Sequence, residues 1–383
     1  MTIDQVQKLL LDGYITAEES DSLLYEYTIW DENTHTVLNN PAWHQPDLKT
    51  IKKIGITGSF GKTCTCEILY QYLRAKGKSC LLLCTNGIFI NDRTVQKDFL
   101  ATSFSKAMLL KLLNGLCGAN SIDYVIIELA AELTTYFNNN LFIDYIQLDI
   151  TGLTFFSQNL TAHFNNDTAF YQRCKDKVLG LAPIRFVPST CTEFNYTDIF
   201  ENVESFRNYN KSQLRNWSLA KAILQKLGEY TIPEEEIPNF YIRGRYEDFL
   251  NNKIIIDTCW SGIRHLCECY KPLNKKFRVI YVPIFWPDIN QSIINYRRRQ
   301  LPTLASCEHV YITDPKEITV EKDLDFYKDF LPEDHSNFEY IFGWENCVRK
   351  AINELQDDEI LLIACRENFR AFRHILVDLL DKE

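Results

Sequence analysis

Apolar runs of strand length alternate along the chain with longer stretches in which apolar residues recur at helical spacing. The runs at 54–57, 79–84, 124–128, 145–150 and 153–156 predict strands, and 184–187 is a further candidate. Apolar positions three and four residues apart predict helices at 64–76, 105–116, 167–180 and 212–227. This alternating order predicts an α/β domain with a central, mostly parallel sheet and helices on both faces.

A second series of the same kind follows a break in the pattern. The tract 230–238 carries two prolines and three consecutive glutamates and is interpreted as a linker. Beyond it we predict strands at 253–257, 278–282, 309–313 and 359–364, with helices at about 261–271, 291–300, 344–355 and 368–381. The predicted domains are therefore a short helical segment at 1–48, a central domain at 49–238 and a smaller Rossmann-like α/β domain at 239–383.

The turn between the strand at 54–57 and the helix at 64–76 is rich in glycine and reads Gly58-Ser-Phe-Gly61-Lys62-Thr63. Glycines let the backbone turn tightly and direct N–H groups at an anion, and the helix N-terminus adds partial positive charge. Lys62 is placed to reach terminal phosphates, and the Thr63 hydroxyl to hold Mg²⁺. We therefore predict a phosphate-binding loop (P-loop), although Ile56 replaces the first glycine of the strict pattern. The predicted nucleotide contacts in this segment are Gly58, Ser59, Gly61, Lys62, Thr63 and Thr65.

An acidic residue ends the apolar run at 124–128. In a parallel sheet, ligands bind beyond the carboxyl ends of the strands, so Glu128 is expected beside the glycine-rich turn. A carboxylate there is a suitable ligand for Mg²⁺. The alternative is an ordinary solvated acid at a strand end.

Several segments in fixed order resemble motifs of the Mur ligase superfamily of ATP-dependent amide ligases, and the muramyl-tripeptide synthetase branch in particular. The stretch Gly55-Ile-Thr-Gly-Ser-Phe-Gly-Lys-Thr63 resembles the ATP loop of that family. The other similar segments are 127–132, 159–163, 171–175, 215–220, 244–247 and 256–257, with weaker similarity at 313–316 and 345–352.

The resemblance implies an enzyme, an acid–amino acid ligase that uses ATP and Mg²⁺. Such an enzyme joins a carboxylate to an amine through an acyl phosphate, with an amino acid or peptide as substrate. The implied catalytic residues are Lys62, His163 and Lys175, the last carbamylated in many members. The implied metal ligands are Thr63, Glu128 and His163, and the implied ATP contacts outside the loop are Asn216, Arg245 and Asp257.

Some family motifs are changed in this sequence. The segment from Asn159 to His163 is one residue short and lacks the aspartate of the family, and 364–368 replaces a Gly-Lys-Gly-His-Glu motif. Two alternatives therefore stay open. One is a non-catalytic or partner-dependent nucleotide-binding protein, and the other is a different P-loop kinase or ATPase.

The amino-acid composition limits the classes of binding partner to be expected. The 383 residues include 41 basic and 51 acidic residues, and the net charge of −10 argues against nucleic acid or an anionic membrane as the partner. The 13 cysteines occur without a secretion signal or metal-site spacing, which predicts reduced thiols, many of them in the core, in a cytoplasmic protein. Small-molecule substrates are thus the expected partners.

Only about 50 residues precede the loop. Family members that act on UDP-linked muramyl peptides carry a nucleotide-sugar domain in this position. We therefore expect the standard UDP site to be absent here, with a different substrate or a protein partner in its place.

Overall fold

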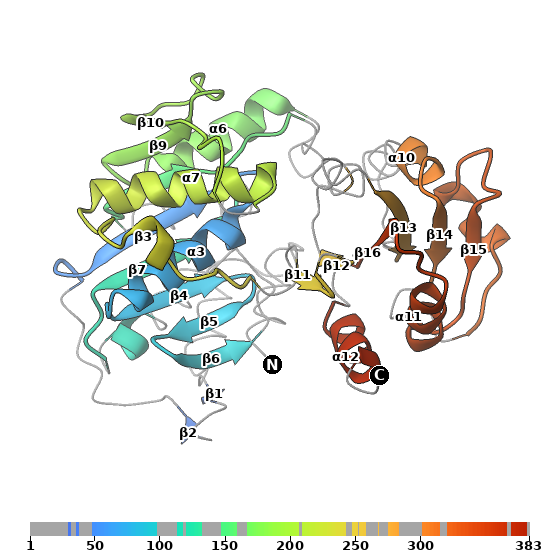
Figure 1. The fold of residues 1–383 in the computed structure, drawn as a ribbon. Coiled ribbons are helices and arrows are strands. Elements are labelled where there is room, and N and C mark those ends of the chain that lie inside the picture. Colours follow the sequence, from blue (N-terminus) through green and yellow to red (C-terminus); the bar gives the residue numbers. More distant parts are fainter. Residues whose placement is uncertain are drawn as a thin grey trace. The chain divides into compact units, whose positions relative to one another are not determined.

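The computed structural model describes the residues from which the fold and the candidate site are built. These are 30–31, 36–37, 48–97, 113–117, 120–131, 147–158, 167–206, 209–242, 247–251, 253–257, 267, 275–282, 301–314, 320–365 and 369–380. Backbone contacts divide the chain into two compact units, Met1–Phe240 and Tyr241–Glu383. Each unit contains a sheet covered by helices (Figure 1).

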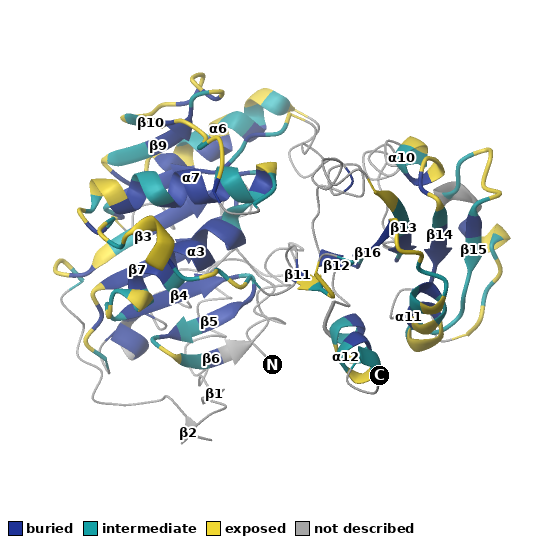
Figure 2. Ribbon diagram, in the orientation of Figure 1, coloured by how far each residue is buried: buried dark blue, intermediate teal, exposed yellow. Residues whose placement is uncertain are grey.

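The first unit is built on an eight-stranded sheet with the order β10-β9-β8-β3-β7-β4-β5-β6. From β10 to β4 all neighbours are parallel, whereas β5 and β6 form an antiparallel extension. The strands are β3 (Lys52–Thr57), β4 (Cys80–Cys84), β5 (Gly87–Ile90), β6 (Arg93–Lys97), β7 (Tyr124–Glu128), β8 (Ile150–Leu153), β9 (Ile184–Pro188) and β10 (Asp198–Phe200). The central strands are largely buried, as a parallel sheet covered on both faces requires (Figure 2).

Helices cover both faces of this sheet, because neighbouring residues of β8 contact helices on opposite sides. A Cβ added to Gly152 would lie 3.0 Å from Leu219 of α7 (Lys211–Lys226). The adjacent Thr151 donates its hydroxyl to the carbonyl of Leu179 in α6 (Thr168–Leu179), at 2.7 Å. Successive strand residues point to opposite faces. Helix α3 (Lys62–Ala75) packs against α7 and so lies on the α7 face (Figure 1).

The prediction of two strands around Gly152 was wrong. In the described residues 147–158 the structure has one strand, Ile150–Leu153, and Gly152 lies inside it. The glycine allows the close approach of Leu219 and Ile223 from α7 and does not break the strand. The short strands β5, β6 and β10 were not predicted. This unit also contains a π-helical turn (Leu113–Cys117) and a 3-10 turn (Glu234–Glu236).

The second unit has a six-stranded sheet with the order β11-β12-β16-β13-β14-β15. All neighbours are parallel except β11 and β12. The strands are β11 (Glu247–Phe249), β12 (Ile254–Asp257), β13 (Lys276–Tyr281), β14 (His309–Ile312), β15 (Phe338–Tyr340) and β16 (Glu359–Ala364). The helical elements are α10 (Leu301–Ala305), a 3-10 helix (Asp325–Phe330), α11 (Trp344–Asn353) and α12 (Phe369–Leu380).

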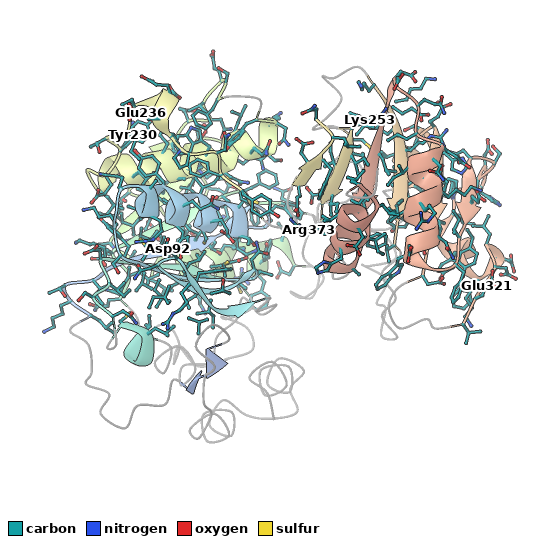
Figure 3. All side chains as sticks on the ribbon, turned by 60° about the horizontal axis from the view of Figure 1, so that its bottom comes forward. Asp92, Tyr230, Glu236, Lys253, Glu321 and Arg373 are labelled. Atoms are coloured by element: carbon teal, nitrogen blue, oxygen red, sulfur yellow. The ribbon has the colours of Figure 1, made fainter. Side chains whose placement is uncertain are left out.

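Both faces of the second sheet are packed. Ile255 and Val279 face a core that includes Leu304 of α10, whereas Ile256 and Ile280 face a core that includes Phe372 of α12. Arg373 of α12 is labelled in Figure 3. Its side chain donates to Glu247 of the edge strand β11. The predicted fold class, a mostly parallel α/β domain followed by a smaller α/β unit, is confirmed.

Little of the predicted helical segment at 1–48 falls within the described residues. The described residues of this segment include two short strands, β1 (Trp30–Asp31) and β2 (Thr36–Val37), which pair antiparallel. Within the described parts of the chain, no helix combines the length and the apolar character needed to cross a bilayer.

Candidate active site

The turn between β3 and α3 has a backbone that only glycine satisfies at two positions. Gly58 has φ +145° and Gly61 has φ +86°. A Cβ would lie 1.9 Å from the Thr154 hydroxyl oxygen at Gly58 and 2.2 Å from the Asn216 side-chain oxygen at Gly61. The glycines therefore permit both the left-handed turn and its close packing against β8 and α7. This is the compact loop that the sequence predicted.

Helix α3 begins directly after this loop, at Lys62. The residue at its N-cap is Gly61, which has no side chain to cap the helix. The first N–H groups of the helix and its positive dipole end thus suit an anion. The Lys62 ammonium folds back over the loop and donates to the carbonyl of Gly58 at 3.2 Å.

Glu128 and Thr63 are brought together by the pairing of β3 with β7. Glu128 ends β7 and lies opposite Ile56, so its carboxylate reaches the start of α3. The Thr63 hydroxyl lies 3.1 Å from Oε1 and 3.0 Å from Oε2 of Glu128, and both residues are buried. Because the hydroxyl gives its only hydrogen to the carboxylate, its oxygen lone pairs can face a cation.

Thr85 donates to the same carboxylate and was not predicted. Its N–H and its hydroxyl lie 2.9 Å and 3.0 Å from Glu128 Oε2. Thr85 follows β4, which pairs with β7, so its place after a buried strand was the available signal. The next residue, Asn86, donates to the buried Glu67 at 3.2 Å.

The residues fit a magnesium ion only in part. Thr63 and Glu128 supply hard oxygen atoms, the ligand type that Mg²⁺ prefers. In the stretches of chain that the structure describes, no group of three His, Cys, Asp or Glu residues is placed to hold a metal by itself. A cation here would therefore share its coordination with a bound phosphate. The predicted ligand His163 and the predicted ATP contact Arg245 lie outside the described residues.

Helix α6 contacts the loop through two residues one turn apart. Lys175 donates to the carbonyl of Gly58 at 2.9 Å and to the Thr57 hydroxyl at 3.3 Å. The Tyr171 hydroxyl shares a hydrogen bond of 2.9 Å with the Ser59 hydroxyl, which also accepts the N–H of Ser157 at 2.9 Å. The Ser59 side chain is thus engaged inside the protein.

The remaining predicted ATP contacts lie at different distances from the loop in the sequence and in different elements of the structure. Asn216 is buried on α7 and packs directly against Gly61, so the structure brings it to the loop. Thr65 is buried within α3, and its hydroxyl has no hydrogen-bond partner among the described residues. Asp257 is the buried last residue of β12, in the second unit.

Cys66 and Cys84 are not suited to metal or nucleophilic chemistry. Burial, with Glu128 and Glu67 adding repulsion, raises the pKa of Cys66 well above its ordinary value. Burial likewise raises the pKa of Cys84. The thiolate is the form that binds metals and attacks electrophiles, so these thiols are inert core residues.

The amino-acid sequence is similar to that of a known ligase. The chain is 24% identical over 384 residues to the UDP-N-acetylmuramoyl-L-alanyl-D-glutamate–2,6-diaminopimelate ligase of Helicobacter pylori, covering 87% of this chain and 83% of the relative. No protein-family profile matches the chain.

Solved structures share the fold at lower sequence identity. FolC of E. coli, solved with DHPP and ADP, has a TM-score of 0.62 at 15% identity, covering 88% of this chain and 91% of that one. The MurF ligase of Thermotoga maritima, solved with ADP, has a TM-score of 0.61 at 14% identity, covering 87% and 81%. The chain is thus similar in sequence to one Mur ligase over most of both chains, and it shares its fold with the solved structures of MurF and FolC.

Proposed function

We propose that the protein is an ATP- and Mg²⁺-dependent ligase that joins a carboxylate to an amine through an acyl phosphate. The observation that carries the proposal is the contact of the Thr63 hydroxyl with the Glu128 carboxylate, directly behind the glycine loop. This contact joins a predicted phosphate site to a predicted cation site. The sequence relative and the two solved structures named above, both with ADP, support the same chemistry.

Each residue near the loop has a distinct part in this proposal. Bound ATP would supply the phosphoryl group, and Mg²⁺ held at Thr63 and Glu128 would offset its charge. Lys62 would leave the carbonyl of Gly58 and pair with the terminal phosphates. The N-terminus of α3 and the loop backbone would hold the remaining phosphate oxygens.

The roles of residues farther from the loop stay predictions. Asn216, Arg245 and Asp257 are proposed to contact ATP, and His163 to bind a second cation. The substrates are proposed to be an amino acid or peptide and a separate carboxylate, in the cytoplasm. The diaminopimelate ligase of Helicobacter pylori is a relative whose name specifies an amino acid substrate, which supports that class.

A direct test measures ADP release with ATP, Mg²⁺ and pooled carboxylates and amines, followed by mass spectrometry for a new amide. ADP release should require both substrates, and Lys62→Ala should reduce it by about a hundredfold or more. Lys177→Ala, an exposed lysine of α6, is the control and should behave as the wild type.

The alternatives give different results in the same assay. A kinase or simple ATPase would release ADP without an amine. A non-catalytic protein would bind ATP and release no ADP with any substrate pool. Full activity of Lys62→Ala would contradict the assignment of the loop itself.

A further inference from the structure

The tight turn between β4 and β5 contacts two different buried acids. Its two residues, Thr85 and Asn86, lie between strands that pair antiparallel. Thr85 donates to Glu128 through its N–H at 2.9 Å and its hydroxyl at 3.0 Å. The side-chain amide of Asn86 donates to Oε1 of Glu67 at 3.2 Å. The turn is therefore tied to the end of β7 by one residue and to α3 by the next.

Glu67 is held firmly on α3. It follows Thr63 by four residues, so the two side chains lie on the same face of the helix. The side-chain amide of Gln71, one further turn along, donates to Oε2 of Glu67 at 3.3 Å. Glu67 is 8% exposed and Asn86 is 7% exposed. A buried hydrogen bond to a carboxylate is costly to lose, so the contact between them fixes the turn against the helix.

These contacts form a closed ring behind the phosphate loop. The ring runs from Glu128 to the Thr63 hydroxyl, along α3 to Glu67, across to Asn86, and through Thr85 back to Glu128. The two hydroxyls that donate to the carboxylate come from different elements, α3 and the β4–β5 turn. The contact of Asn86 with Glu67 joins these elements directly, and so sets how the two hydroxyls lie relative to each other.

We propose that Glu67 and Asn86 are positioning residues for the cation site, which hold the 85–86 turn against α3. With the turn held there, the hydroxyls of Thr63 and Thr85 reach the Glu128 carboxylate together. This inference rests on the proposed Mg²⁺ site and extends it to residues that do not touch the cation. The loop backbone and Lys62 are not part of the ring. Loss of the contact therefore changes the Mg²⁺ dependence of ATP binding and not ATP binding in EDTA.

The test compares the full-length wild type with Asn86→Ala, Glu67→Ala and Glu67→Gln by titration with ATP, at several Mg²⁺ concentrations and in EDTA. The two alanine variants should raise the Mg²⁺ concentration needed by about threefold to tenfold, the effect of one hydrogen bond. Glu67→Gln should stay within about twofold of the wild type, because its amide oxygen still accepts from Asn86. Asn120→Ala is the control, since Asn120 donates to the carbonyl of Leu116 ahead of the amino end of β7.

A double variant tests whether Asn86 acts through its neighbour. Thr85→Val removes the hydroxyl that the turn presents to Glu128. If Asn86 positions that hydroxyl, Thr85→Val/Asn86→Ala should need less Mg²⁺ than the product of the two single effects predicts. Single effects that multiply in full would overturn the route through Thr85.

Three further results would overturn the proposal. An Asn86→Ala variant with the Mg²⁺ dependence of the wild type would do so, whether or not its urea unfolding changes. Equal weakening in EDTA and in Mg²⁺ would indicate a role in packing alone. A Glu67→Gln variant as impaired as Glu67→Ala would show that the negative charge of Glu67 acts on the cation, and not the position of the turn.

The same titrations separate this inference from the proposed function. A wild type whose ATP binding does not depend on Mg²⁺ would contradict the cation site, and this inference with it. A wild type that binds ATP with Mg²⁺ and forms no amide would contradict the ligase proposal alone. An unaltered Asn86→Ala variant beside a Mg²⁺-dependent wild type would contradict the role of Asn86 and Glu67 alone.

Discussion

The Thr63 hydroxyl donates to both oxygens of the Glu128 carboxylate, at 3.1 Å and 3.0 Å. The two residues are 65 positions apart in the sequence, and the parallel pairing of β3 with β7 brings them together. The hydrogen bond orients the hydroxyl so that its free lone pairs and the carboxylate are available to one cation. This arrangement predicts that the negative charge of Glu128 contributes to cation binding.

Glu128→Gln should raise the Mg²⁺ concentration needed for ATP binding by about tenfold or more. The amide keeps the size of the side chain and one oxygen acceptor, but it loses the negative charge that holds the cation. Nucleotide titrations at several Mg²⁺ concentrations measure the effect, and binding in EDTA should not weaken. Asp149→Asn is the control, because Asp149 accepts the N–H of Lys53 at the amino ends of β3 and β8, whereas Glu128 lies at the carboxyl end of β7. An unchanged Mg²⁺ dependence would exclude Glu128 as a ligand.

Thr85→Val should have a similar but smaller effect on Mg²⁺. The change removes the hydroxyl that donates to Glu128 at 3.0 Å and keeps the backbone donor at 2.9 Å. Loss of a group that orients a metal ligand commonly costs about tenfold in metal affinity. Thr85→Ser should restore binding. Thr151→Val removes another buried hydroxyl from the same sheet and should leave the Mg²⁺ dependence unchanged.

The elements around the loop could be predicted because their signals are local. The strand at 52–57, the glycines and the helix from Lys62 follow one another without interruption, and Glu128 is marked by its position at a strand end. Thr85 also follows a buried strand, but a threonine in that position is a much weaker signal than a carboxylate. Its role depends on the pairing of β4 with β7, and 43 residues separate it from Glu128.

Gly152 shows that contacts between distant parts of the sequence also limit the prediction of the fold. The sequence analysis predicted separate strands at 145–150 and 153–156, on either side of this glycine. In the structure it stays in the strand because Leu219 and Ile223 of α7 fill the space above it. The distant helix decides the local structure, and neither periodicity nor propensity includes that contact.

Gly61→Ala should destabilise the protein more than Gly77→Ala does. Both glycines have positive φ, +86° and +75°, but a Cβ at Gly77 meets nothing within 4 Å. Gly77→Ala therefore measures the left-handed strain alone, about 1–2 kcal/mol in the free energy of unfolding. At Gly61 the added Cβ also clashes with the Asn216 oxygen, 2.2 Å away.

Urea unfolding without nucleotide measures this difference. The double variant Gly61→Ala/Asn216→Ala should recover most of the extra cost, because the clashing side chain is gone. A double variant as unstable as Gly61→Ala would show that the contact with Asn216 is not the cause.

Glu229 joins the end of α7 to the end of α3 and makes folding sensitive to acid. Its buried carboxylate receives the Tyr124 hydroxyl at 2.6 Å and the ammonium groups of Lys76 at 2.5 Å and Lys78 at 3.0 Å. Burial alone would raise the pKa of Glu229, but hydrogen bonds from Lys76, Tyr124 and Lys78 outweigh it and lower the pKa from 4.5 to about 2. A folded-state pKa below the unfolded value stabilises the protein above the unfolded pKa.

Stability should therefore fall as the pH drops from about 4.5 toward 2, where the Glu229 carboxylate takes up a proton. The contribution at neutral pH is about 3 kcal/mol, since each pKa unit corresponds to about 1.4 kcal/mol. Glu229→Gln should lose most of it at pH 7, and its difference from wild type in unfolding free energy should shrink as the pH falls below about 4.5, as followed by urea unfolding. Asp92→Asn removes the exposed partner of Arg74 and should change stability little at any pH. A Glu229→Gln deficit that stays constant between pH 7 and pH 3 would show that packing, and not the ionised carboxylate, stabilises this junction.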